Sequence, residues 1–358
     1  MLMFKKKNSS YLYIFFLVLV FFFNEFSTNR ALSKNYNVLD VKVEEVYDIN
    51  FDKSKVVDKA FNKAFKILFY KLIENKDKSK INIISLEDKK SLIENFSIND
   101  EIFIDNKYIA KFNVQFNKRK ILNYLNNKGL IPSSPIEIES FILPILIDTN
   151  SNELYYLNQN IFYKIWNSNQ KNYHLIKYVL PNEDIEDYNI IKKNINNIEN
   201  YNFNEIAEKY NLKNKIILII LKSNSLIRVF SKIKFDEKKF LSNNIYSLDD
   251  IKNEEEMSNI IFNIKDNYED KWKSINKINT SIELPIKLSI DAENVKFSEK
   301  LENKLSTIDL VSDFKIEIFN NKEIIYKINF NGNPNKLINI MSLYDFKIDT
   351  SKEIWKVK

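Results

Sequence analysis

The sequence contains no cysteine, a single histidine and only two glycines among its 358 residues. Without cysteine the chain can form no disulfide, thiolate nucleophile, iron–sulfur cluster or cysteine-ligated zinc site. The single histidine, His174, excludes a site with several histidine ligands and leaves one candidate imidazole base. The two glycines, Gly129 and Gly332, lie far apart, so neither can belong to a glycine-rich nucleotide-binding loop. The sequence therefore predicts neither a common nucleotide-binding fold nor a cofactor.

Composition and charge indicate a folded protein without a strong electrostatic partner. Hydrophobic residues make up 44% and charged residues 28% of the chain, which is typical of globular domains. A chain of this length is expected to form two or three domains. The formal net charge is +6, but residues 1–33 carry half of it, and a body with a charge of +3 has no footprint for nucleic acid.

The N-terminal residues have the three-part layout of an export signal. Lys5, Lys6 and Lys7 precede an uncharged apolar run at residues 11–23, and residues 31–33 (ALS) offer small side chains for cleavage. Thirteen apolar residues are short for a transmembrane helix, which needs roughly 20. We expect a cleaved signal, with an uncleaved membrane anchor as the alternative. Both place the rest of the chain outside the cytoplasm, in the periplasm of a bacterial envelope.

Hydrophobic periodicity predicts an α+β protein of two or three small modules, each a mixed or antiparallel sheet with covering helices. Apolar residues recur at helical spacing over residues 53–73 and 253–275, whereas residues 107–116 alternate as a strand does. The predicted division is residues 1–33 as signal or anchor, 34–130 as an N-terminal module, 131–136 as a linker, 137–250 as a central module, 251–279 as a connecting helix and 280–358 as a C-terminal module. The last has the element order β-α-β-β-α-β and is predicted to be ferredoxin-like.

The most polar cluster is a weak candidate for a metal site. Glu183, Asp184, Glu186 and Asp187 supply the oxygen ligands that a hard cation prefers. Their spacing is not that of an EF-hand, and no glycine allows its sharp turn. Acidic residues also stabilise the start of a helix, so we interpret the cluster mainly as a helix cap. We assign no catalytic or cofactor-binding residue.

The other chemically conspicuous residues are better explained by structure than by catalysis. His174 precedes an apolar strand and has neither an orienting partner nor a nucleophile nearby in sequence. Trp166, Trp272 and Trp355 stand among apolar residues, which predicts core packing. The basic run at residues 118–120 is interpreted as a solvated face.

Three stretches resemble an uncharacterised family of bacterial envelope proteins, domain of unknown function 2066 (DUF2066). They are VLDVKVEEVYDINFDKSKVVDKAFNKAFKILFYKLI, the segment from YIAKFNVQFNKRKILNYLNNKGLIP through FILPILID to LPNEDIEDY, and the tail from LPIKLSI to NKLINIMSLYDF. The resemblance implies an exported component of the Gram-negative envelope. It supplies no activity and no catalytic residues, and this chain departs from the family by having little Gly, Ala and Arg.

Together these observations favour a non-catalytic interaction or scaffold protein whose partners are envelope proteins. Contact with a membrane is expected only through an uncleaved N-terminal segment. Two alternatives remain: a hydrolase that uses carboxylates such as those at residues 183–187, and a carrier of lipids or other apolar ligands. Paired carboxylates in a cleft would favour the hydrolase, a deep apolar pocket the carrier, and exposed sheet edges or apolar patches the scaffold.

Cleavage of the signal predicts a new N-terminus near Lys34. N-terminal sequencing of the protein recovered from the envelope fraction checks this, and an intact Met1 would show instead that the apolar run is retained as an anchor.

Overall fold

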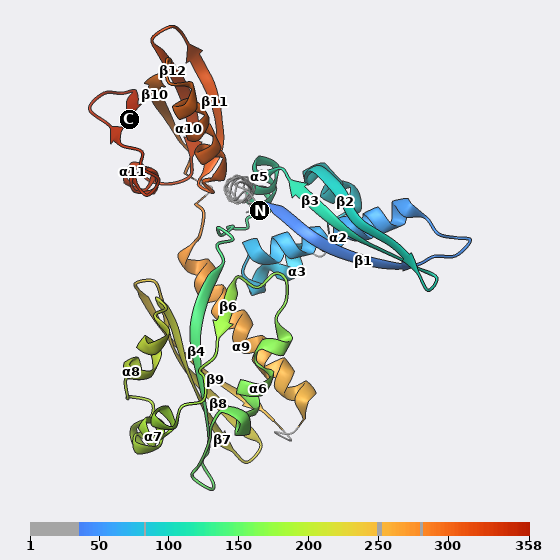
Figure 1. The fold of residues 1–358 in the computed structure, drawn as a ribbon, viewed down its shortest axis with the longest axis vertical. Coiled ribbons are helices and arrows are strands. Elements are labelled where there is room, and N and C mark those ends of the chain that lie inside the picture. Colours follow the sequence, from blue (N-terminus) through green and yellow to red (C-terminus); the bar gives the residue numbers. More distant parts are fainter. Residues whose placement is uncertain (1–35, 82–83, 249–252, 280–281) are drawn as a thin grey trace, which may run out of the picture.

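The computed structural model describes residues 36–81, 84–248, 253–279 and 282–358. The predicted signal at residues 1–33 lies outside this range. The chain forms the predicted α+β architecture, in three modules that extend from a common centre (Figure 1). In the described part of the chain, no helix is both long enough and apolar enough to span a membrane.

The N-terminal module is a three-stranded antiparallel sheet in the order β1-β3-β2, with α2 packed on one face. β3 alternates between buried and more exposed side chains, so the face away from α2 is open. Asp105 and Asn106, both with positive φ, form the turn between β2 and β3. The elements are β1 (Asn37–Val46), α2 (Lys53–Leu72), α3 (Lys78–Ile81), α4 (Leu86–Leu92), β2 (Ile93–Ile104), β3 (Lys107–Phe116) and α5 (Lys118–Asn127).

The central module is a mixed sheet with helices on both faces. Its main strand order is β5-β4-β7-β8-β9, and β6 also pairs with β4. The helices α6 and α9 cover one face, and α7 and α8 cover the other. The elements are β4 (Ile138–Asp148), β5 (Glu153–Tyr155), α6 (Ile161–Ile165), β6 (Ile176–Val179), α7 (Ile185–Lys193), α8 (Asn204–Ala207), β7 (Asn214–Ser223), β8 (Leu226–Phe235), β9 (Lys238–Ser247) and α9 (Glu254–Ile275).

The C-terminal module follows the predicted order of elements but differs at its end. In a double split-βαβ unit the last strand would run antiparallel to the first, whereas β14 pairs with β10 in parallel. An extra strand, β13, precedes β14 and pairs with it, and the sheet order is β11-β12-β10-β14-β13. The elements are β10 (Leu284–Asp291), α10 (Val295–Thr307), β11 (Val311–Phe319), β12 (Glu323–Phe330), α11 (Pro334–Ser342), β13 (Ile348–Asp349) and β14 (Trp355–Val357).

The middle of the segment predicted to be a linker, residues 132–135, is buried between modules. Ser133 is only 2% exposed, and its amide and hydroxyl both donate to the carbonyl of Leu72 at the end of α2. Ser134 donates to the carbonyl of Asn276, and Ile278 to that of Pro132. The prolines prevent regular structure, as expected, but the backbone donors are used to join the modules.

The helix predicted to connect two modules, α9, belongs to the core of the central one. Met257, Ile261, Tyr268 and Trp272 are buried against the central sheet. Its 22 residues follow the N-cap Asn253, whose side chain accepts hydrogen bonds from the amides of Glu255 and Glu256. Segments that bind the charged side chains of α9 are therefore held against the central module.

Candidate functional site

Three charged side chains lie buried on one face of α9. Lys265, Glu269 and Lys273 are each at most 2% exposed and are spaced four residues apart, so they follow one another along the helix. Buried charges are tolerated only where hydrogen bonds or opposite charges replace water. We call these three residues the ion ladder of α9.

Each residue of the ion ladder binds the backbone of another segment. The Lys265 ammonium donates to the carbonyl of Trp166 at 2.5 Å, and the Glu269 carboxylate accepts from the amides of Leu175 and Ile176 at 3.0 Å. The Lys273 ammonium donates to the carbonyls of Tyr70 and Ile73, at 2.6 and 2.9 Å. The ladder therefore ties α9 to the segment between α6 and β6, and also to the end of α2 in the N-terminal module.

Additional polar contacts surround this junction. The Asn75 amide donates to the Asp270 carboxylate at 2.9 Å, and Lys78 lies 3.4 Å from Asp266. The Glu74 carboxylate forms an ion pair with the Lys277 ammonium at 2.7 Å. The N-terminal and central modules are thus joined by charge-assisted contacts along one side of α9 and just beyond its end.

Burial changes the acid–base properties of the ion ladder. It raises the pKa of Glu269 to about 7, in spite of the nearby Lys273 ammonium and the two amides that donate to the carboxylate. Burial likewise lowers the pKa of Lys265 to about 8 and lowers the pKa of Lys273. A shift of this kind can mark a catalytic site, but these groups contact backbone rather than an open cleft.

His174 lies beside the ion ladder and stays neutral. It is 6% exposed, and its Nδ1 accepts from the amide of Lys171 at 3.3 Å. Burial, reinforced by the positive charge of Lys265 and Lys78, lowers the pKa of His174 to about 3. Its Nε2 is buried without a hydrogen-bond partner among the described residues. This arrangement agrees with the structural interpretation of His174.

The acidic cluster forms a helix cap and an ion-pair network. Asp184 is the N-cap of α7 and accepts from the amide of Glu186. The Lys209 ammonium lies 2.7 Å from both Asp184 and the buried Asp187, so a lysine already occupies the place between them. Glu183 and Glu186 are exposed to solvent. Across the described residues, no three His, Cys, Asp or Glu side chains are grouped to hold a metal ion.

The basic run at residues 118–120 is not simply the solvated face that its sequence suggested. The Lys118 side chain is partly buried, and its ammonium donates to the carbonyl of Ile308 at 2.6 Å and lies 3.9 Å from Asp309. Arg119 pairs with Asp313 at 3.4 Å. The run joins α5 to the C-terminal module, and sequence periodicity could not reveal a contact made across about 190 residues.

The tryptophans pack into cores, as predicted. Trp166 and Trp272 are buried in the central core, and Trp355 is partly buried in the C-terminal core. The Trp272 indole also donates to the carbonyl of Ile136 at 2.7 Å, which adds a contact to the buried linker.

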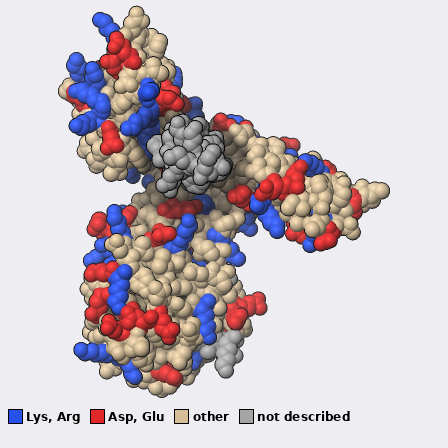
Figure 2. Space-filling view, viewed as in Figure 1, with Lys and Arg blue, Asp and Glu red and all other residues tan. Residues whose placement is uncertain are grey.

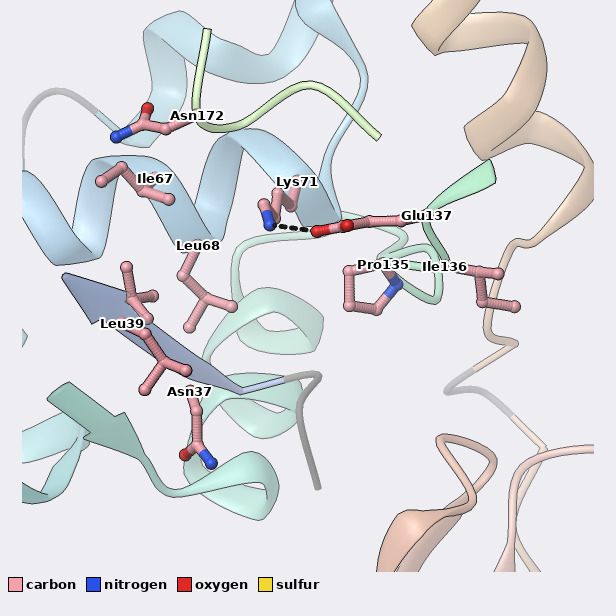
Figure 3. Close-up of a pocket in the computed structure, with 10 residues that line it drawn as sticks. Asn37, Leu39, Ile67, Leu68, Lys71, Pro135, Ile136, Glu137 and Asn172 are labelled. Atoms are coloured by element: carbon pink, nitrogen blue, oxygen red, sulfur yellow. Dashed lines mark hydrogen bonds and ion pairs between the residues drawn. The ribbon is translucent and has the colours of Figure 1, made fainter. Parts of the chain in front are cut away.

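A cavity of about 580 Å³ opens between the N-terminal module and the linker. Figure 3 shows Leu39, Ile67 and Leu68 on one side, and Lys71 and Glu137 in contact with each other on the wall. The Lys71 ammonium and the Glu137 carboxylate are 3.0 Å apart. An ion pair at this position gives the cavity mixed polarity, unlike the deep apolar pocket of a lipid carrier.

The clearest candidate for an interaction site is the far end of the N-terminal module. Six large apolar side chains are exposed there: Val46, Tyr47, Ile49, Ile102, Phe103 and Ile104. We call this set the apolar tip. The amide of Tyr47 donates to the carbonyl of Asn106 at 2.7 Å, which holds the β1–α2 connection against the β2–β3 turn. Exposed apolar side chains gathered at one place mark interaction surfaces.

The apolar tip has packed aromatic rings at its base and exposed side chains at its end. The Tyr47 ring lies 4.9 Å from the rings of both Phe51 and Phe103, and Phe103 also contacts the buried Tyr108. Ile49 is fully exposed and Phe103 is 58% exposed, so the aromatic base leaves a wide apolar end uncovered.

Acidic residues surround the apolar tip. The two segments that form it, residues 44–52 and 100–106, contain seven Asp or Glu and no Lys or Arg. Four of the acids pair with lysines elsewhere in the module, in the contacts Lys107–Glu44, Lys59–Glu45, Lys111–Asp100 and Lys53–Glu101. Figure 2 shows the end of this arm as uncharged surface, with Asp and Glu side chains behind it.

Sequence reasoning missed the ion ladder and the apolar tip for different reasons. On α9, each ladder residue directly follows an apolar residue of the predicted stripe (Ile264, Tyr268 and Trp272), and this adjacency was the available signal. The tip combines residues from two segments about 55 positions apart. Only the pairing of β1 and β2 with β3 brings them together.

Comparisons with known proteins add no relative. No protein-family model matches the chain, and no curated protein matches it in sequence. The resemblance to domain of unknown function 2066 therefore stays a prediction.

Replacing Glu269 with alanine is expected to lower the free energy of unfolding by about 3–5 kcal/mol, because it leaves two buried amides without their acceptor and removes the negative charge near Lys273. Glu269→Gln keeps an acceptor oxygen and should cost clearly less. Glu254→Ala, in the exposed first turn of α9, is the matched control and should cost about 0.5 kcal/mol. Urea titration monitored by tryptophan fluorescence measures all three, and equal losses for Glu269→Ala and Glu254→Ala would contradict a structural role for the ladder.

The pKa of His174 predicts how stability depends on pH. Its folded pKa of about 3 lies below the unfolded value near 6.5, so between these values the unfolded chain binds more protons and stability falls as pH falls. The loss attributable to His174 should be about 1.4 kcal/mol per pH unit below 6.5. A His174→Asn variant should lack this component. Subtracting the two pH profiles cancels the contribution of Glu269.

Because the chain has one histidine, NMR can follow its imidazole directly. The folded protein should show no titration of this ring above pH 4. A midpoint near 6.5 in the folded protein would contradict the burial described here.

Proposed function

We propose that the protein is an exported, non-catalytic interaction protein of the Gram-negative cell envelope, in which the apolar tip binds a partner protein. The observation that carries this proposal is the exposure of six large apolar side chains at the end of a projecting arm. The N-terminal layout of basic residues followed by an apolar run supports export.

The charges around the apolar tip favour a protein partner with basic residues at its rim. Protein interfaces combine an apolar centre with a polar rim. Asp48 and Asp105 form no ion pair with any described residue, and Asp52 serves as the N-cap of α2, so the rim keeps unpaired negative charge. An anionic membrane surface would instead attract unpaired lysines. Charge complementarity thus supports a partner with an apolar surface flanked by Lys or Arg.

The alternatives find less support in the geometry. A hydrolase would need two carboxyl groups that face a cleft, whereas Asp184 and Asp187 both bind Lys209. A carrier would need an enclosed apolar cavity, whereas the cavity beside α2 is bordered by the Lys71–Glu137 ion pair. The geometry of the described residues therefore favours neither the hydrolase nor the carrier.

Photocrosslinking in cells tests the proposal. A photoreactive phenylalanine analogue at Phe103 should give one discrete crosslinked protein, whereas the same analogue at Lys66, on the exposed side of α2, should give none. Adding Ile49→Ser and Ile104→Ser should remove the crosslink without lowering the melting temperature, because both side chains are exposed in the free protein.

Three other outcomes would count against the proposal. Crosslinks to lipid would assign the tip to a membrane, and recovery of the monomer alone would deny it a partner. A crosslink that survives both serine substitutions would show that the apolar surface does not determine binding.

A further inference from the structure

Four lysines converge on a second cavity, in the central module. It has a volume of about 310 Å³ and lies between the segment at residues 200–204 and the strands β7, β8 and β9. Lys215, Lys232, Lys234 and Lys239 line it, and its lining contains no aspartate or glutamate. This separation of charge is unusual in a chain whose lysines and acidic residues are nearly balanced in number.

The strand register places three of these lysines in one row. Lys215 on β7 pairs with Lys234 on β8, and Lys234 pairs in turn with Lys239 on β9. Residues directly opposite each other on neighbouring strands point to the same face, with Cβ atoms about 5 Å apart. Like charges in such positions destabilise a sheet. The row is therefore a cost to the folded protein unless an anion offsets it.

The fourth lysine lies in the next row of the same face. Lys232 pairs across the sheet with Ile217 on one side and Leu241 on the other. Its ammonium donates to the carbonyl of Tyr201 at 3.0 Å, a contact that orients the side chain, and Glu199, which lies outside the cavity lining, acts on its charge from a distance without forming an ion pair. Among the described residues, none of the four lysines forms an ion pair.

Glu208, Asp236 and Glu237 are close in sequence to the cavity wall but are not part of its lining, and two further acids beside the wall are engaged elsewhere. Glu199 forms a two-point ion pair with Arg228, with its closer contact at 2.5 Å, and Glu205 accepts the hydrogen bond of the Tyr201 hydroxyl. The rest of the wall is apolar or neutral, and includes the buried Phe203 and Ile217 and the exposed Leu241. The cavity thus offers a cluster of positive charge beside an apolar surface.

We propose that this cavity binds a phosphate group. A phosphate monoester carries a charge of about −1.5 to −2 at neutral pH and three acceptor oxygens, which suits several converging ammonium groups better than a single carboxylate does. The volume is at the lower end of the range for small-molecule sites and accommodates a phosphate with a small organic part. The phosphate can belong to a soluble molecule or to a lipid headgroup whose chains leave the cavity along the apolar wall. The site is separate from the apolar tip and does not depend on the function proposed for it.

The test compares two variants on neighbouring residues of the sheet. Lys234→Gln removes the central charge of the row. Lys238→Gln removes a charge from β9 next to Lys239, on the opposite face of the strand, and is the matched control. Melting temperatures of the full-length protein in detergent are measured with inorganic phosphate or diphosphate, against sodium chloride of equal ionic strength. Binding to phosphatidylcholine vesicles with and without phosphatidic acid is measured in parallel.

Diphosphate is expected to raise the melting temperature of the unchanged protein and of Lys238→Gln by about 3 °C or more near saturation. Lys234→Gln should bind about tenfold more weakly and show little shift. In sodium chloride without phosphate or diphosphate, Lys234→Gln should melt at the same or a higher temperature than the unchanged protein. Removing the like-charge contacts should offset any stability lost through the substitution. This result would also show that the variant is folded.

The vesicle arm identifies the source of the phosphate. Binding to phosphatidic acid that depends on Lys234, with no effect of soluble phosphate or diphosphate, would support a lipid headgroup. A shift by soluble phosphate or diphosphate that depends on Lys234, with no binding to phosphatidic acid, would support a soluble ligand. The proposal is overturned if neither probe binds, or if Lys234→Gln and Lys238→Gln respond equally to both probes. Vesicle binding through the N-terminal apolar run would be equal in Lys234→Gln and Lys238→Gln, which distinguishes it from binding at the cavity.

Discussion

A charged side chain remains in a protein interior only if other groups replace the water it has lost, and α9 carries three such side chains on one face. Their partners are backbone groups that belong to two other parts of the chain. Lys265 and Glu269 require the segment that leads into β6, and Lys273 requires the last turn of α2. Separating the N-terminal and central modules would leave Lys273 without its partners, whereas Lys265 and Glu269 fix α9 within the central module. We infer that this requirement holds the N-terminal and central modules in one arrangement.

The rest of the structure depends on this arrangement. With α2 fixed against α9, the N-terminal sheet projects as an arm whose open end carries the apolar tip. The buried linker adds hydrogen bonds from Ser133 to α2 and from Ser134 to the residue that follows α9. Lys118, at the start of α5, extends the same principle to the C-terminal module by donating to Ile308. Both proposed binding surfaces, the tip and the lysine-lined cavity, therefore lie on modules held by buried polar contacts.

The sequence predicted the elements of the fold better than it predicted the contacts between modules. The apolar stripes of α2 and α9 and the alternation along β3 depend on neighbouring residues, and the structure confirms them. β9 was not predicted, because an edge strand with no buried residue gives no hydrophobic alternation. The contacts of Lys273 and Lys118 with other modules could not be predicted, because a lysine on a solvated helix has the same sequence pattern. Both proposed sites combine distant segments, and only strand pairing brings their residues together.

The most direct test of the account is the distance between the modules, measured by pulsed electron spin resonance. The absence of cysteine allows spin labels to be placed at Lys66→Cys on α2 and Lys193→Cys on α7 without background. The account predicts one narrow distance distribution in the otherwise unchanged protein. It predicts a clearly broader distribution in Lys273→Met, which removes both hydrogen bonds to the end of α2. Equal widths in the two proteins, whether narrow or broad, would contradict the claim that the ion ladder of α9 holds the modules together.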